Sequence, residues 1–482
     1  MLMATPPGWS RGRASGLSAG LILVAALSMG GGVGRLNAQV PPPPKGEAPK
    51  ADEPAKPDER AKAAAVDVAT VKKADATEVF IDPNAEAARV NTFAELTYAG
   101  KVPTKAENDE VASGAVGTNR ALVTNYINYW AAQLTKKDAI DEMMKLDGDQ
   151  PAIALRISVA SVALARPFRD AQSSPQYKSE YTRALIPVVK DLLNRQMYAR
   201  IAGMTALSCS IDPAILPICT EVLRNPEQLL AVKDRAAVGI IVVAASAKNP
   251  LDPASQVIPA ADALVDFLNK DETRCWPVHL RAVEALGYLR LAGNPQRDQG
   301  DYAGAALRLL ADPQGRPEVR AKAAWALGMM NVSRNSGKFN FALLVHHCGL
   351  LAVDLATRVV AADPTNQPRA KALTNQLLYV GEALSGDAAI GSGLMRNGHP
   401  NAVNIRSTTE KIAQAVLAES KLAVELSDAP KAQRVRIRTE LTARASELKT
   451  LLTKTAPTDW KLVPEGPEYR PTPPAVAAGA PR

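Results

Sequence analysis

The run His346-His347-Cys348 is the part of the sequence best suited to metal chemistry, because imidazole and thiolate are common zinc ligands. Two ligands on one helix share a face only when they are three or four residues apart. Adjacent helical residues point about 100° apart, and Cys348 falls on the apolar face of Leu344 and Leu351. We therefore predict no metal site and no cofactor. We interpret the run as a histidine pair near a helix surface beside a buried cysteine.

Two other stretches invite a search for anion binding or catalysis. "GSGLMRNG" at 391–398 lacks the glycine spacing, the Lys-Ser/Thr pair and the preceding strand of a phosphate loop. "RVRIR" at 434–438 places Arg436 four residues before Glu440, which favours a solvated helix face, with contact to an acidic partner as the alternative. A Ser or Cys nucleophile needs a basic partner, which four scattered histidines do not supply. We predict no catalytic residue and no enzyme activity.

Composition separates this chain from layered enzymes. Of its 482 residues 46% are hydrophobic but only 4% are aromatic, which suits helices packed through Ala, Leu and Val. The formal charge is +8, and loss of the three arginines in residues 1–38 leaves +5. Because a net charge of +5 is small for a chain of this length, we predict no nucleic-acid-binding surface.

The N-terminus has the pattern of an export signal. A basic start precedes the apolar run 16–29, and Leu36 and Ala38 occupy positions −3 and −1 of a signal peptidase site. The run is shorter than the roughly 20 residues that span a bilayer. We predict a cleaved signal peptide at 1–38 and export to the periplasm, cell envelope or exterior; an uncleaved signal anchor is the alternative. No later run of membrane length is expected, so no integral membrane segment should follow the signal.

Both ends of the exported chain read as disordered. Residues 39–78 form a linker that is rich in Pro, Ala, Lys and Glu and contains no aromatic residue. Such a composition buries too little apolar surface to offset chain entropy. The same reasoning predicts a disordered tail at 456–482.

A motif recurs between these ends. Its copies place a basic-type residue seven positions before a Leu or Ile, and these residues are Arg200, Lys233, His279 and Arg320. "VHLRAVEALG" at 278–287 and "VRAKAAWALG" at 319–328 superpose without a gap. Weaker copies begin at Arg156 and Arg369, and the spacings run from 33 to 49 residues. Recurrence near 40 residues is typical of arrays of two-helix repeats.

Each stronger copy is followed by a second apolar segment with helical periodicity. Turn signals separate the segments, at Asp212-Pro213, Asp252-Pro253, Asp312-Pro313 and Asp363-Pro364. Asp caps a following helix and Pro fits its first turn. The sequence therefore predicts alternating first and second helices.

The basic residue followed by small residues and Ala-Leu-Gly resembles the HEAT repeat family, including its short lyase-like variants, over residues 151–386. The resemblance implies an all-α fold, an α-solenoid of stacked antiparallel helix pairs. Some relatives are enzymes, but the paired His-Glu motif of the iron-dependent hydroxylases is missing here. No residue set can be assigned to lyase chemistry.

The repeat gives its glycines a physical purpose. Gly in a helix interior costs roughly 1 kcal/mol against Ala. Gly287 and Gly328 occupy the same motif position, so we interpret them as sites where helix axes approach closely. The basic residues of the motif are interpreted as structural positions at repeat junctions.

Helical caps are predicted on either side of the array. Residues 79–150 form an N-terminal cap, in which 121–146 is one amphipathic segment with Tyr126, Tyr129 and Trp130. Residues 387–406 are predicted to form a loop, and 407–455 a charged helical hairpin. The four cysteines contain no zinc-type spacing, and Cys209 and Cys219, across a short turn, are a candidate disulfide.

The preferred function is a scaffold that binds a protein partner. Repeat arrays expose extended surfaces, and we expect the second helices to line the concave one. The candidate binding residues there are Arg195, Arg224, Asp262, Asp266, Arg308 and Asp354. The alternatives are a lyase-type enzyme of the same repeat class, or a carbohydrate or cell-wall binder that uses the aromatic N-terminal cap. The pattern indicates no oligomeric state.

Overall fold

The computed structural model describes residues 95–117, 119–136, 151–247, 250–270, 275–297, 300–330, 332, 339–362, 367–386, 391–397 and 403–470. By internal contacts the chain divides at residue 74, and the described residues all belong to the second unit, 75–482. The predicted signal peptide at 1–38 and linker at 39–78 lie outside the described residues. So do parts of the predicted N-terminal cap, of the loop at 387–406 and of the C-terminal tail.

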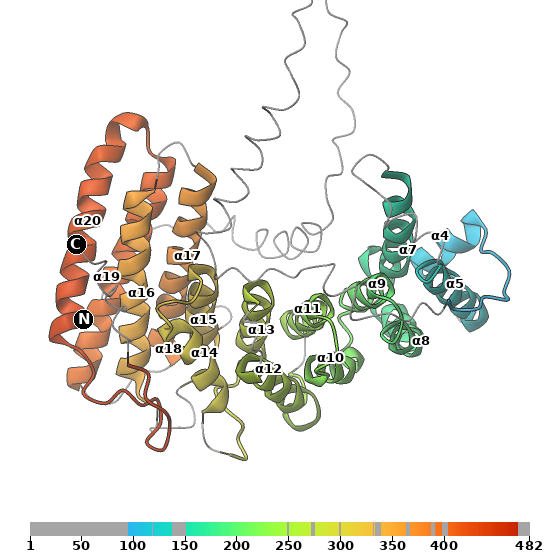
Figure 1. Cartoon of the computed structure of the whole chain (residues 1–482), viewed down its shortest axis with the longest axis horizontal. Helices are drawn as coiled ribbons and strands as arrows, with labels where there is room; N and C mark the ends of the chain where they lie inside the picture. The colour runs from blue at the N-terminus through green and yellow to red at the C-terminus, as the bar shows by residue number, and fades with distance from the viewer. Residues whose placement is uncertain are drawn as a thin grey trace, which may run out of the picture. The chain divides into compact units, whose positions relative to one another are not determined.

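The described residues form sixteen α-helices and two short helical turns, and they contain no β-strand (Figure 1). The prediction of an all-α fold is confirmed. In chain order the elements are α4 (Lys105–Ser113), α5 (Arg120–Gln133), α7 (Pro151–Arg169), α8 (Pro175–Leu192), α9 (Met197–Leu207), η1 (Pro213–Ile215), α10 (Leu216–Arg224), α11 (Leu230–Ser246), η2 (Pro253–Val257), α12 (Ile258–Lys270), α13 (Trp276–Leu289), α14 (Asp301–Ala311), α15 (Pro317–Met329), α16 (Phe341–Ala361), α17 (Gln367–Ser385), α18 (Leu394–Asn397), α19 (Val403–Asp428) and α20 (Lys431–Lys454).

Local hydrogen bonds explain where several of these helices begin. Thr104 and Glu107 form a capping box at the start of α4, each side chain accepting from the backbone N–H of the other. Ser174 caps α8 through its hydroxyl. Asp212 and Asp252 accept from backbone N–H groups at η1 and η2, so two of the four predicted Asp-Pro turns start helical segments. Asp312 instead ends α14, with α15 beginning at Pro317, and Asp363 lies outside the described residues.

The helices that carry the repeated motif lie side by side. α7, α9, α11, α13, α15 and α17 pack in that order, each against the next, and α19, which carries no copy of the motif, continues the row. We call this row the first layer. The intervening helices α10, α12, α14, α16 and α20 pack in a second row, and each of α10, α12, α14 and α16 also contacts the first-layer helix that follows it in the chain (Figure 1). The sequence alternation of first and second helices thus becomes an alternation between two layers.

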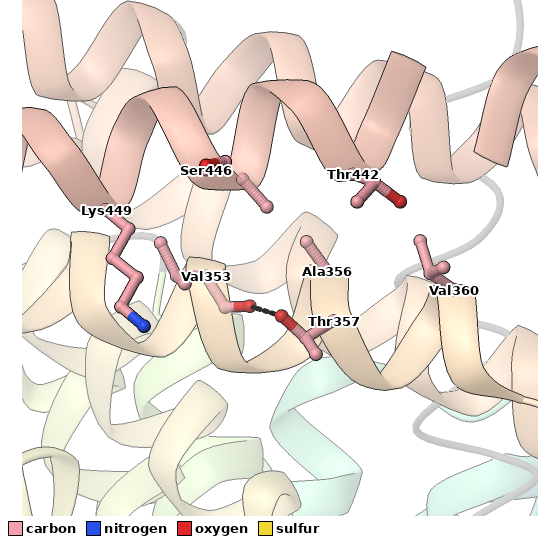
Figure 2. Close-up of a pocket in the computed structure, with 8 residues that line it drawn as sticks. Val353, Ala356, Thr357, Val360, Thr442, Ser446 and Lys449 are labelled. Atoms are coloured by element: carbon pink, nitrogen blue, oxygen red, sulfur yellow. Dashed lines mark hydrogen bonds between the residues drawn. The ribbon is translucent and has the colours of Figure 1, made fainter. Parts of the chain in front are cut away.

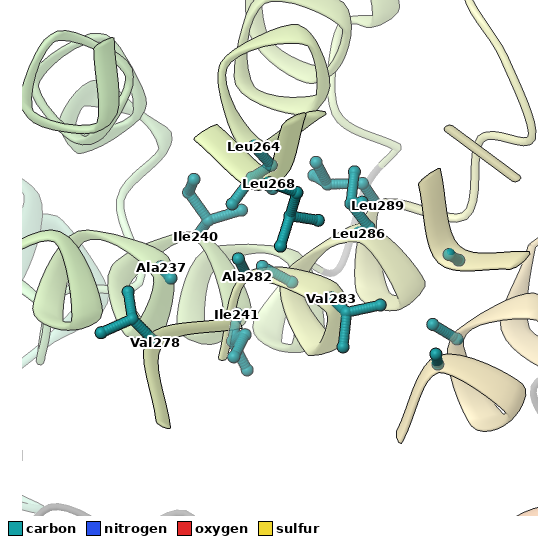
Figure 3. Packing of buried hydrophobic residues seen from close by; sticks show 14 of the residues in the cluster. Ala237, Ile240, Ile241, Leu264, Leu268, Val278, Ala282, Val283, Leu286 and Leu289 are labelled. Carbon is teal, nitrogen blue, oxygen red and sulfur yellow. The ribbon is translucent and has the colours of Figure 1, made fainter. Parts of the chain in front are cut away.

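The core lies between the layers. Figure 3 shows side chains of α11, α12 and α13 meeting there, among them Ile240, Leu264, Leu268 and Leu286. Each is almost fully buried, and burying such a side chain stabilises the fold by about 1.5–3 kcal/mol. Alanines of the first layer, such as Ala282, fill the closest approaches between helices. The low aromatic content therefore does not prevent a continuous core.

The C-terminal region holds two long helices. α19 and α20 pack against each other and against α16, and Pro430 stands at the N-cap of α20. Within the predicted loop at 387–406 the structure has a short helix, α18, whose Leu394 is buried. Loop composition alone did not reveal this anchored turn.

The predicted disordered tail is wrong for residues 456–470. An isolated β-bridge joins Lys461 to Glu468, and Leu462 is buried in the common core. The Leu462 carbonyl also accepts from the Asn340 backbone N–H at 2.8 Å, next to the start of α16. Although this stretch is rich in proline, its aromatic and apolar residues, such as Trp460 and Leu462, pack in or against the core.

One described helix, α16, has the length and apolar composition of a membrane span, contrary to the expectation that no such run follows the signal. In the structure 67% of its most apolar window is buried within the protein. Its neighbours are α14, α15, α17, α19 and α20. These contacts give its apolar surface a partner within the fold.

Candidate functional site

Two of the basic motif residues hydrogen-bond to the ends of preceding helices. Arg200 donates through Nε to the carbonyl of Arg195, just beyond α8. Arg320 donates through Nε to the Leu310 carbonyl, in the last turn of α14, at 3.2 Å. Helix C-termini carry carbonyls without intrahelical partners, and a guanidinium satisfies them well. These positions tie successive helices together.

The other two basic motif residues meet at one aromatic ring. The ammonium of Lys233 on α11 lies 5.4 Å from the centre of the Phe267 ring. The ring of His279 on α13 packs edge-on against the same phenyl group, with centroids 5.7 Å apart. Because Phe267 belongs to α12, the pair joins two first-layer helices to the second-layer helix between them.

The repeated glycines lie at direct contacts between first-layer helices. A Cβ placed on Gly287 would stand 2.9 Å from the Cα of Ala326 on α15. A Cβ on Gly328 would stand 2.6 Å from the Cα of Ala383 on α17. Only a residue without a side chain permits these separations, so close helix packing accounts for both positions.

Most of the predicted concave-face residues make contacts within the chain. Asp262 accepts from Arg297 at 2.7 Å and from the Tyr302 hydroxyl at 2.8 Å. Arg308 on α14 donates to the Leu268 carbonyl near the end of α12, at 3.0 Å. Both contacts join neighbouring second-layer helices, so they position the helices within that layer.

Of the remaining concave-face candidates, three form ion pairs within the chain and one is exposed. Asp354 pairs with Arg320 at 3.2 Å and with a neighbour on its own helix. Arg195 pairs with Asp191 at 2.8 Å, and Asp266 lies 3.7 Å from Lys270. Arg224 is exposed at the end of α10. The predicted face therefore consists largely of side chains already held by the fold.

The His346-His347-Cys348 run is buried, contrary to the expectation of a histidine pair near the surface. Both imidazoles pack edge-on against the Trp460 indole, with ring centroids 5.4 Å and 6.0 Å away. His347 Nε2 lies 2.8 Å from the Tyr469 carbonyl, so the neutral ring donates there. The folded end of the chain thus covers the run.

Acidification should destabilise this contact between α16 and residues 460–469. Burial lowers the pKa of both His346 and His347 to about 4, from an ordinary value of 6.5. Between pH 6.5 and 4 these histidines bind protons in the unfolded chain but not in the folded chain. Their contribution to stability is therefore fully present above pH 6.5 and is lost as the pH falls to 4. Each histidine accounts for a loss of up to about 3 kcal/mol.

Urea unfolding at pH 7 and pH 4.5 measures this loss. The His346→Phe/His347→Gln variant keeps an aromatic ring and an N–H donor but cannot titrate. We expect the wild type to lose more stability than this variant on going from pH 7 to pH 4.5, because all other titrating groups are common to both proteins. Equal losses in both proteins would contradict the assignment.

The candidate disulfide between Cys209 and Cys219 is wrong for this structure, in which both thiols are free. The Cys209 sulfur lies 3.7 Å from Arg169 Nη2 and 3.5 Å from the Thr205 carbonyl. Cys219 is fully buried, with its sulfur against Gly239 of α11. The turn between them sends the side chains toward different helices.

Tyr126 and Trp130 of α5 pack in or against the core, and the half-buried Tyr129 ring contacts Tyr98 and Trp130. Tyr126 is almost fully buried and donates to the Ala163 carbonyl of α7 at 2.7 Å. Trp130 is partly buried and donates to Asn108 at 3.1 Å. The helix also ends at Gln133, short of the predicted segment 121–146, whose last ten residues lie outside the described residues. This arrangement does not favour the carbohydrate-binding alternative.

Sequence reasoning missed a second basic position in the repeat. Two residues after four of the six motif positions, at Lys233, His279, Arg320 and Arg369, the first-layer helices carry another basic residue. These are Arg235 on α11, Arg281 on α13, Lys322 on α15 and Lys371 on α17. We call these four residues the basic ladder. The same ungapped alignment that revealed the first column contains this column as basic-x-basic pairs.

Acidic side chains partly neutralise the basic ladder. Glu284 pairs with Arg281 at 2.8 Å and with Lys322 of the next helix at 3.1 Å. Burial by itself raises the pKa of Glu284, but Lys322 and Arg281 outweigh it and hold that pKa below its usual value. Burial raises the pKa of Asp234, which Arg235 opposes. Three cations against two carboxylates leave this part of the layer positive.

Aromatic rings surround the third cation of the ladder. The Lys322 ammonium lies 3.9 Å from the centre of the Tyr379 ring and 4.7 Å from that of Trp325. Tyr288 packs against Trp325 with centroids 5.2 Å apart. Lys322 is buried and the three rings are partly exposed, so this cation and its rings join α13, α15 and α17 and leave some ring surface open to solvent.

A separate hollow of about 280 Å³ lies between α16 and α20 (Figure 2). Val353, Ala356 and Val360 form one side of it, and the Thr357 hydroxyl is turned back to the Val353 carbonyl at 2.7 Å. Lys449 is the ionisable side chain on its wall. Such a wall offers apolar contact and one cation, without the paired groups of acid–base catalysis.

Within the described part of the chain, no group of three or more His, Cys, Asp or Glu side chains comes together as a metal site would require. A scan against protein-family models matches no family, and a search among curated proteins finds no significant match. The resemblance to HEAT repeats rests on the repeated motif.

Proposed function

We propose that this chain is an exported α-solenoid of HEAT-like helix pairs, capped by helices at both ends, that acts as a scaffold for a partner protein. The basic ladder is the observation that carries the proposal. Successive repeats carry a cation at one motif position, on helices that pack side by side. Arg281 is partly exposed and Lys371 is exposed, whereas Arg235 and Lys322 are buried within the row. A position that recurs from helix to helix, and that reaches solvent at Arg281 and Lys371, suits an extended ligand better than a small substrate.

The chemistry of the ladder indicates an acidic partner segment. The ladder cations Arg235, Arg281 and Lys322 exceed their carboxylate partners, Asp234 and Glu284, by one. Lys371 adds an exposed charge on α17. Trp325 and Tyr379 provide flat apolar contacts beside them. Electrostatic complementarity of this kind selects partners and speeds their association. The export part of the proposal rests on the signal pattern of residues 1–38.

Affinity capture from a cell-envelope extract tests this function. The bait is the chain from residue 39 onward, beside a variant with Arg281→Gln and Lys371→Gln. We expect the wild type to retain a protein partner that the variant binds about tenfold more weakly. The matched control, Lys411→Gln with Lys454→Gln, removes two exposed charges from α19 and α20 and should bind normally. Recovery of no protein above background, or equal recovery by both variants, would overturn the proposal.

A further inference from the structure

A hollow of about 430 Å³ lies between α5 and α8, away from the basic ladder. Its floor includes Val123 and the rings of Tyr177 and Tyr181. The Tyr177 hydroxyl donates to the Val111 carbonyl at 2.6 Å and the Tyr181 hydroxyl to the Leu164 carbonyl at 3.0 Å. Because both hydroxyls are used elsewhere, the floor offers apolar ring surface.

Two arginines stand on the wall of this hollow. Arg120 comes from the first turn of α5 and Arg183 from the middle of α8, and both are exposed. Neither makes a hydrogen bond or ion pair with a described residue. Glu180 also lines the wall, and it accepts from Gln176 at 3.3 Å. The wall therefore carries a net charge of one positive unit above an apolar floor.

We propose that the hollow binds a monoanionic carboxylate ligand with a compact apolar body. Its volume falls within the roughly 300–1,000 Å³ of small-molecule sites. The planar guanidinium donates two parallel hydrogen bonds to a carboxylate, while the tyrosine rings and Val123 contact the apolar body. The Glu180 carboxylate on the same wall repels a second negative charge, which disfavours phosphate dianions. This site goes beyond the scaffold function and does not depend on it.

Calorimetric titration of the purified protein with phenylacetate tests the site. Arg120→Ala and Arg183→Ala should each weaken binding at least about tenfold, because each removes a charged hydrogen bond. Both side chains are exposed, so the variants should fold. The control Arg444→Ala removes an exposed arginine of α20 and should leave the affinity unchanged. Ala184→Leu, which fills the hollow without changing its charge, should also weaken binding.

Other probes separate this chemistry from general charge attraction. Benzylammonium has a similar body with the opposite charge and should bind far more weakly than phenylacetate. Inorganic phosphate lacks the apolar body and should also bind more weakly. The proposal is overturned if phenylacetate gives no saturable binding up to ~10 mM, if either control ligand matches it, or if both arginine variants keep wild-type affinity.

Discussion

Replacement of Gly328 by leucine is expected to lower the free energy of unfolding by about 3 kcal/mol or more. A Cβ at this position would lie 2.5 Å from the Ala383 carbonyl oxygen and 2.6 Å from the Ala383 Cα. These are backbone atoms of α17, so no side-chain rotation can relieve the overlap. The two helices must separate, and the apolar contacts between them weaken.

Neighbouring contacts limit that separation. α15 is held between α13 and α17 within the first layer. The Gly328 carbonyl also accepts from the Gly393 backbone N–H at 2.7 Å, which fixes the segment that precedes α18. Movement of α15 away from α17 would therefore disturb its other neighbour and this hydrogen bond.

Thermal and urea unfolding measure the effect. Gly328→Ala should fall between the wild type and Gly328→Leu. Gly304→Ala on α14 is the matched control, because its added Cβ would approach only the hydroxyl end of the Tyr469 side chain, at 3.0 Å. That change should be neutral or slightly stabilising, since Ala favours helix over Gly by about 1 kcal/mol. An unchanged melting temperature for Gly328→Leu would rule out the packing explanation.

Local patterns in the sequence were enough to predict the helices and their repeat. The spacing of small and apolar residues places 278–287 within α13 and 319–328 within α15. The glycine positions follow from the same alignment, because equivalent residues of a repeat meet equivalent neighbours. Information of this kind lies within a single repeat, so a single sequence reveals it.

Contacts between distant segments were not predictable in this way. Tyr469 and His347 are 122 residues apart, and neither segment carries a sign of the other. Trp460 and Leu462 stand in a stretch without helical periodicity, where composition favours disorder. The contact between Trp460 and the histidines of α16 becomes visible only in the folded structure.

Charged residues were the hardest to interpret. Asp262 and Arg308 have the types expected of a binding face, but the fold uses both to join helices. A solvated charge and a structural ion pair look alike in a sequence. The basic ladder, by contrast, was available as the pairs Lys233/Arg235 and Arg320/Lys322. Comparing whole repeat units, rather than single anchors, would have found it.

Glu419→Met is expected to raise the free energy of unfolding by about 3 kcal/mol at pH 7. Glu419 is fully buried on α19, on the same helix face as Val416 and Ala423. Neither of its carboxyl oxygens has a hydrogen-bond partner among the described residues. Burial is the cause that raises its pKa to about 8, from an ordinary value of 4.5. An apolar side chain of similar length removes this buried polar group.

The effect of this carboxyl group depends on pH in a defined direction. Between pH 4.5 and 8 the folded chain keeps a proton on Glu419 that the unfolded chain releases. Folding is therefore destabilised progressively as the pH rises through this interval. The penalty is small near pH 4.5 and reaches about 5 kcal/mol above pH 8. The buried histidines act in the opposite direction, because they lose stability as the pH falls from 6.5 to 4.

Urea unfolding of Glu419→Met and the wild type at pH 5, 7 and 9 isolates the carboxyl group, because the histidines contribute equally to both proteins. The stability difference should grow at each step toward alkaline pH. Glu425→Met, on the exposed side of the same helix, is the control and should change stability only slightly. A constant difference for Glu419→Met would mean that the carboxylate finds water or a cation within the fold. A difference that widens with pH would instead show that α19 buries an acid which the fold tolerates only while it is protonated.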